Sequence, residues 1–300
     1  MAKPHRSPQR SSIDRGTLAI ATLIYGGWLA ATTWHAVIPT PLLVLIGAWL
    51  IAWHGSLQHE TIHGHPTHIA AIDRAIGFVP LSLWLPYSLY YRSHIAHHGS
   101  AEITNPHEDP ESRYVARRGG AAWLAARIQS TLPGHMLAGP PIVLARFLNS
   151  EIRRAFSEPV QVIRDWLPHL AAVAVLLVWL DHVGLSLGRY ILTFVYPGMA
   201  LTMLRSFAEH RARIDTPGRA ASVERGGLFG LLFLNNNLHA AHHERPGLSW
   251  HKLPAYHRHH RARLIREGAV LYAGYGEIVR RFALRSHDSP LHPAFERPVE

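Results

Sequence analysis

Histidine carries the most distinctive chemistry in this sequence: it occurs 24 times in 300 residues, and cysteine is absent. Three clusters stand out: "HETIH" at 59–63, "HIAHH" at 94–98 and "HAAHH" at 239–243. Residues three and four apart share one face of a helix, so each cluster can aim two or three imidazoles at one point. Because neutral imidazole is a common metal ligand, the clusters predict a metal centre.

The number of imidazoles suits two metal ions better than one. Structural zinc takes four ligands, and catalytic zinc takes three and a water. Imidazole also binds iron, copper and nickel, and a neutral nitrogen shell would leave two irons electrophilic, as O2 activation requires. The candidate ligands are His59, His63, His94, His97, His98, His239, His242 and His243.

The remaining histidines are interpreted differently. We expect His35, His135, His169 and His182 to be surface or structural residues, and we assign no ligand role to His257, His259 or His260. The absence of cysteine excludes a disulfide framework, a thiolate zinc site and an iron–sulfur cluster held by this chain. Electrons for any redox reaction must therefore come from a separate protein.

Two other classes of protein remain open. "HETIH" is also the zinc-protease pattern, with Glu60 as general base, but that interpretation leaves both H-x-x-H-H clusters unexplained. A non-catalytic membrane or metal-storage protein is the other alternative. Nucleic-acid binding is not expected, because the net charge of +10 forms no basic stripe interleaved with aromatic residues.

The elements that must position the histidines are predicted from the apolar blocks. About 20 apolar residues can cross a bilayer as a helix, and basic residues flank these blocks as they do beside anionic lipid headgroups. We expect four membrane-spanning helices, near 17–38, 41–62, 166–186 and 189–208. Residues 69–91 and 121–150 are expected to lie in the membrane interface.

This arrangement predicts an all-α integral membrane protein with a helical cytoplasmic cap that carries the histidine site. The predicted parts are a basic cytoplasmic N-terminus (1–16), a membrane domain (17–260) and a cytoplasmic C-terminal tail (261–300). Both termini and all three clusters then lie on the cytoplasmic side. We expect a bacterial inner membrane as the location.

In this order and spacing, the clusters resemble the three histidine boxes of the membrane-bound fatty acid desaturase superfamily, over roughly residues 17–260. The resemblance implies that the eight histidines bind two non-haem irons that use O2 as co-substrate. Stearoyl-CoA desaturases have a further ligand at the end of the fourth span, where this chain has His210. They carry an asparagine one turn earlier, where this chain has Ser206.

Other motifs are similar to neighbouring enzyme classes. "HETIH" and "NPHEDPESRY" at 105–114 resemble alkane hydroxylases, and the third cluster resembles bacterial desaturases and carotenoid ketolases. The implied reaction is oxidation of unactivated C–H bonds in a lipid or fatty acyl chain. Desaturation is the first expectation and hydroxylation the alternative, since both reactions begin by removing one hydrogen.

The resemblance also implies partners and supporting residues. The acyl group could be attached to CoA, to a carrier protein or to a lipid, and the electron donor could be a ferredoxin, a rubredoxin or a Rieske protein. Metal-bound imidazoles usually donate their second N–H to a nearby acceptor. The candidates for this outer set are Glu60, Asp109, Ser206, Glu209 and Asn236.

Overall fold

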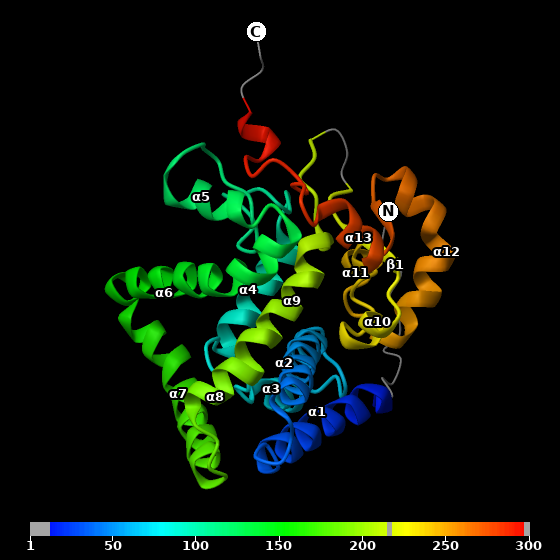
Figure 1. Cartoon of the computed structure of the whole chain (residues 1–300). Coiled ribbons are helices and arrows are strands. Elements are labelled where there is room, and N and C mark those ends of the chain that lie inside the picture. The colour runs from blue at the N-terminus through cyan, green and yellow to red at the C-terminus, as the bar shows by residue number, and fades with distance from the viewer. Residues whose placement is uncertain (1–12, 215–217, 297–300) are drawn as a thin grey trace.

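The computed structural model describes residues 13–214 and 218–296, and it is mostly helical (Figure 1). The elements of the first half are α1 Arg15–Thr33, α2 Thr40–Ile62, α3 Ala70–Phe78, α4 Tyr87–Gly99, α5 Gly120–Ile128, the π-helix η1 Gly134–Ala138 and α6 Gly139–Ser157. Those of the second half are α7 Pro159–His182, α8 Leu187–Tyr190, the π-helix η2 Ile191–Val195, α9 Tyr196–Glu209, β1 Ala221–Arg225, α10 Leu228–Leu232, α11 His239–Glu244, the short η3 Trp250–Lys252, α12 Leu253–Arg266, β2 Val270–Gly274, α13 Tyr275–Phe282 and η4 Pro293–Phe295.

Two long helical segments form the centre of the molecule. The helix α2 packs along the continuous segment of α8, η2 and α9, and α1 lies beside α2 (Figure 1). The hydroxyl of Tyr25 on α1 is 3.3 Å from Nε2 of His54 on α2. Small residues allow this close approach. A Cβ atom on Gly47 would lie 2.3 Å from the carbonyl oxygen of Thr193, and one on Gly198 would lie 2.4 Å from Cβ of Ile51. The two segments therefore meet backbone to backbone, which fixes the ends of α2 and α9 relative to each other.

Among the described residues, three helical segments are long and apolar enough to cross a membrane: Thr40–Ile62, Pro159–His182 and Leu187–Glu209. They correspond to the expected spans 41–62, 166–186 and 189–208. The expected span 17–38 is wrong at its C-terminal end, because α1 stops at Thr33 and a turn follows. At 19 residues, α1 is within the range of about 17–25 residues that a spanning helix needs, so its length does not exclude a further span. Among the described residues, the structure thus shows three candidate spans and not clearly a fourth.

Two helices between the spans α2 and α7 are held to α7 by a buried carboxylate. Asp165 of α7 lies 2.6 Å from a guanidinium nitrogen of Arg92 on α4 and 2.6 Å from one of Arg154 on α6. The α6 helix is amphipathic, and it leaves Ile152 and Phe156 exposed. In α7 only 17% of the apolar stretch is buried, which leaves most of that helix free to face lipid. Because Asp165 ties α4 to these helices, it also fixes the second histidine cluster.

The C-terminal part contains a short sheet as well as helices. Strands β1 and β2 pair in parallel, with Ala221 opposite Val270 and Arg225 opposite Gly274. Residues 261–296, which we expected as a tail, supply Tyr272 and Ile278 to the main hydrophobic core. This C-terminal cap (residues 218–296) gathers around the ends of α2 and α9 (Figure 1). Residues 1–12 of the expected N-terminus and residues 297–300 lie outside the described ranges.

We predict that Gly47→Ala lowers the thermal stability of the detergent-solubilised protein, because the added methyl group meets the backbone oxygen of Thr193. Overpacking of this kind costs about 1–3 kcal/mol. The matched control is Gly55→Ala on the same helix, where no atom lies within 4 Å of the added Cβ. Tryptophan fluorescence during heating measures both variants, and equal midpoints would contradict the proposed backbone contact.

Candidate metal centre

Four helix ends bring the histidine clusters together. His59 lies in the last turn of α2 and His63 caps it, while α4 carries His94, His97 and His98. The short helix α11 begins at His239 and includes the whole third cluster, and His210 is the residue at which α9 ends. The backbone turns to an extended conformation at His210 and directs the chain away from the α9 axis.

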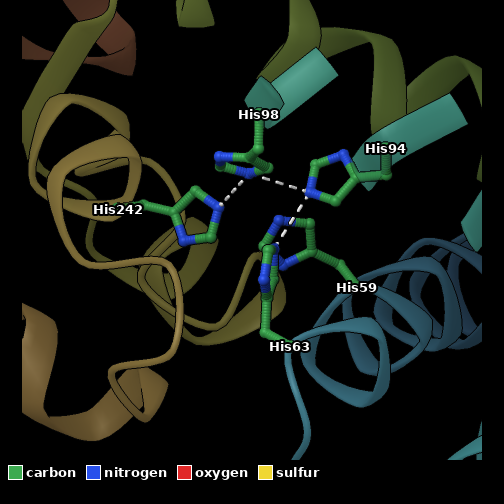
Figure 2. A group of neighbouring side chains, drawn as sticks. All are labelled: His59, His63, His94, His98 and His242. Carbon is green, nitrogen blue, oxygen red and sulfur yellow. Dashed lines mark hydrogen bonds between the residues drawn. The ribbon is translucent and has the colours of Figure 1, made fainter. Parts of the chain in front are cut away.

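The nine imidazoles form two groups. The first consists of His59, His63, His94, His98 and His242, and the second of His97, His210, His239 and His243. Within each group, the potential ligand atoms lie within 4.8 Å of one another. Figure 2 shows the five rings of the first group, which come from α2, α4 and α11 and turn toward a common centre. The eight box histidines and His210 are therefore all gathered at one place.

The nitrogen atoms are spaced as the ligands of a metal ion would be. In the first group, Nε2 of His94 is 3.0 Å from that of His63 and 3.1 Å from that of His98. In the second group, Nε2 of His243 is 3.0 Å from that of His239 and 3.1 Å from that of His210. Two nitrogens bound at right angles, each at about 2.1 Å from a metal, would be about 3.0 Å apart.

Hydrogen bonds between the imidazoles can explain only part of this convergence. Nδ1 of His97 lies 2.8 Å from Asp109, Nδ1 of His94 lies 3.2 Å from Glu111, and Nδ1 of His239 lies 2.9 Å from Oδ1 of Asn236. Each of these acceptors requires a proton on Nδ1, so Nε2 of a neutral ring presents a lone pair to the centre. One lone pair accepts one hydrogen bond, yet Nε2 of His94 and Nε2 of His239 each have two neighbouring Nε2 atoms within 3.1 Å. A shared cation accounts for both neighbours, and the donor set therefore fits two metal ions.

The charge around the two groups is also suited to cations. Four carboxylates approach Nδ1 atoms of the histidines, two in each group. In the first group they are Glu60, at 3.8 Å from His59, and Glu111 beside His94. In the second group they are Asp109 beside His97 and Glu209, at 3.6 Å from His239. Carboxylates in these positions favour the binding of cations.

Asn236 connects the two groups, because its Oδ1 accepts from His239 while its Nδ2 lies 3.3 Å from Nε2 of His59. Of the residues expected around the ligands, Glu60, Asp109, Glu209 and Asn236 therefore lie beside histidines of the site. Ser206 does not: its hydroxyl bonds with His135 at 3.0 Å and lies near Met203. The side chain of Ser206 points toward η1, so it has no described contact with the nine histidines.

The histidines that we set apart lie outside both groups, as far as the described residues show. His257 bonds with Glu224, His169 with the carbonyl oxygen of Leu83, and His35 with that of Val183. His259 is exposed on α12. These rings have local partners, which is the ordinary condition of a structural histidine.

Two residues of the site escaped the sequence analysis. Glu111 follows Asp109 in "NPHEDPESRY", and its carboxylate accepts from His94 across the loop after α4. Arg205, one turn before Glu209 on α9, forms an ion pair with Glu209 at 2.8 Å. The run of acidic residues after the second cluster was a usable signal for Glu111, but nothing in the sequence distinguished Arg205 from the other arginines that end the span.

Burial and mutual proximity keep most of the ligands neutral. Burial, followed by the neighbouring imidazoles, lowers the pKa of His98 to about 3 and that of His63 to about 2. The same causes hold the pKa values of His239, His242 and His243 well below the usual range. His97 is different, because burial is outweighed by its hydrogen bond to Asp109 and by nearby carboxylates, which raise its pKa. Neutral imidazole is the form that binds a metal.

A comparison with known protein families agrees with this arrangement. A family model described as fatty acid desaturase matches residues 32–275, well over half of the chain and a range that includes all nine histidines. No curated protein matches the sequence.

We predict that His242→Ala and His243→Ala each remove about one of two bound metal ions, because the two residues belong to different groups. Elemental analysis of the purified protein measures the metal content per chain. His259→Ala is the control, and it should bind as much metal as the unchanged protein. Full metal content in both group variants would show that the grouping is wrong.

We predict that the metal-free protein unfolds at a lower temperature at about pH 5.5 than at about pH 7.5. The unfolded chain takes up protons near pH 6.5, whereas His98 and His63 stay neutral in the fold, so stability is complete above about pH 6.5 and falls below it. At one pH unit below 6.5, the free energy of unfolding is lower by roughly 1 kcal/mol for each such histidine. Groups whose pKa the fold raises, such as His97, act in the opposite direction, but the buried histidines whose pKa is lowered outnumber them. A higher midpoint at the lower pH would contradict the assigned protonation.

Proposed function

The chain belongs to the fatty acid desaturase family, and from this premise we propose that it is a membrane-bound, O2-dependent di-iron enzyme that introduces a double bond into a lipid or fatty acyl chain. Membership of the family implies an oxidoreductase that acts on lipid chains with the help of an electron donor. The observation that carries the more specific proposal is the convergence of nine imidazoles in two groups.

The residues of each group would hold one iron. When bound, the two irons use O2 and electrons from the donor to break C–H bonds that acid–base side chains cannot break. Asp109 and Glu111 fix the orientation of His97 and His94, and Asn236 fixes that of His239, so that Nε2 of each ring faces the metal. These contacts position the ligands before a metal arrives, which avoids a cost of reorganisation when it binds.

The site lies where an alkyl chain within the membrane could reach it. His59 and His63 end the span α2, and His210 follows directly on the span that ends with α9. A chain lying between these spans would present a methylene group to the histidines while its polar head stays at the surface. We place the histidine site and both termini on the cytoplasmic side of a bacterial inner membrane, within reach of a ferredoxin, a rubredoxin or a Rieske protein.

Desaturation and hydroxylation differ only after the first hydrogen is removed. In desaturation, a second hydrogen leaves the neighbouring carbon, and one O2 is reduced to two waters with two electrons and two protons from the donor and solvent. In hydroxylation, one oxygen atom enters the product and one water forms. The histidine ligands serve both reactions equally well, so hydroxylation of a lipid or alkyl chain is the alternative product of the same site.

The placement of Glu60 argues against a zinc protease. Its carboxylate is 3% exposed and accepts a hydrogen bond from the backbone N–H of Trp250 at 3.3 Å. A general base would have to face a metal-bound water. Instead, the nearest described contacts of the Glu60 carboxylate are with Trp250 and with Nδ1 of His59, at 3.8 Å. His59 and His63 also share their group with three further imidazoles, whereas a catalytic zinc keeps an open position beside three ligands.

We predict that cells which express the chain contain lipids about two mass units lighter than those of cells without it. Mass spectrometry of extracted lipids measures this difference. His98→Ala should abolish it, while immunoblotting shows that the variant remains in the membrane. A gain of about sixteen mass units would establish the hydroxylase instead, and lipids that are identical with and without the chain, in the presence of a competent donor, would contradict both reactions.

A further inference from the structure

A buried arginine lies beside the two histidine groups, and none of the roles described so far includes it. The side chain of Arg205 is only 12% exposed, and its Nε is 2.8 Å from Oε1 of Glu209, whose side chain is 9% exposed. An exposed pair at this i, i+4 spacing would contribute about 0.3–0.5 kcal/mol. A buried pair often gives no net stability, because both ions lose their hydration. Stability of the helix therefore does not explain why the pair lies here.

The carboxylates around Arg205 lead to both histidine groups. Glu209 is 3.6 Å from Nδ1 of His239 in the second group. Glu111 accepts from Nδ1 of His94 in the first group. Burial raises the pKa of Glu111, but His94, His97 and then the positive charge of Arg205 lower it to about 2. Arg205 is thus a positive charge that acts on one carboxylate of each group.

A positive charge in this position has a definite effect on a redox centre. The carboxylates beside the histidines offset part of the charge of bound metal ions, and Arg205 adds one positive charge to that set. In a buried site this charge is poorly screened. It opposes any further gain of positive charge by the metals, so it stabilises the reduced pair relative to the oxidised pair. Electron transfer from a donor becomes more favourable as a result.

We propose that Arg205 is a positioning residue that holds Glu209 behind His239 and raises the reduction potential of the metal pair through its charge. The proposal rests on the proposed di-iron function. It concerns how readily the site accepts electrons, and it assigns Arg205 no contact with the substrate.

The test compares Arg205→Gln, which removes the charge, with Arg205→Lys, which keeps it. Each protein is loaded with iron, its iron content is measured, and its midpoint potential is determined by redox titration followed by electron paramagnetic resonance. We expect a lower potential in Arg205→Gln, by about tenfold in the equilibrium constant for one-electron reduction, which corresponds to 59 mV. Arg205→Lys should stay close to the unchanged protein. Arg261→Gln, which breaks the exposed pair with Glu224 on the cap, is the control and should show no shift.

A fully loaded Arg205→Gln protein with an unchanged potential would overturn the proposal. If that variant does not fold or bind iron, Glu209→Gln decides, because loss of this negative charge should raise the potential. An unchanged midpoint potential in Glu209→Gln would also overturn the proposal. If the unchanged protein binds no iron at all, the proposed function fails instead, so the two failures are distinguishable.

Discussion

The structure depends on one electrostatic constraint: imidazole nitrogens from four helix ends face one another at about the distance of two hydrogen-bonded atoms. Nε2 of His94 and Nε2 of His239 each have two such neighbours within 3.1 Å, but a ring that donates its Nδ1 proton elsewhere has one lone pair there and can accept one hydrogen bond. A cation in each group accommodates all of these nitrogens at once. The close contact of α2 with α9 at Gly47 and Gly198, and the link from α4 to α7 through Asp165, bring the ends of these helices to the same place.

In the second feature of the site, the candidate ligands are imidazoles and the carboxylates are separate residues beside them. All nine candidate ligands are imidazoles, and the four carboxylates approach their Nδ1 atoms. A carboxylate bound directly would lower the charge at the metal itself. Placed behind an imidazole, it orients the ring and offsets the charge at longer range, which leaves the metal strongly electrophilic. This arrangement suits the oxidation of a C–H bond that has no polar group to activate it.

Much of the site could be predicted from the sequence, because most of the ligands lie within a few residues of one another in three short clusters. Spacings of three and four residues within "HETIH", "HIAHH" and "HAAHH" determine which imidazoles share a helix face, and those eight residues do meet in the structure. His210 came from a family resemblance and lies in the second group. Ser206 lies one turn earlier on the same helix, but its rotation about the helix axis and the presence of His135 turn it toward η1.

Other features depended on contacts between distant segments. Neither the split into groups of five and four nor the link of Asn236 to both groups can be derived from spacing within one cluster. The expected span 17–38 was too long because hydropathy alone does not show where a helix stops; here it stops at Thr33. The expected C-terminal tail contributes Tyr272 and Ile278 to the core, a contact that depends on the pairing of β2 with β1, whose residues lie 49 positions earlier than their partners in the chain.

X-ray absorption spectroscopy at the iron edge of the purified protein tests the central claim most directly. We predict a nearest shell dominated by nitrogen and an outer pattern that requires several imidazole rings for each metal. A shell dominated by oxygen, with one or two imidazoles at most, would contradict the assignment of the nine histidines as ligands.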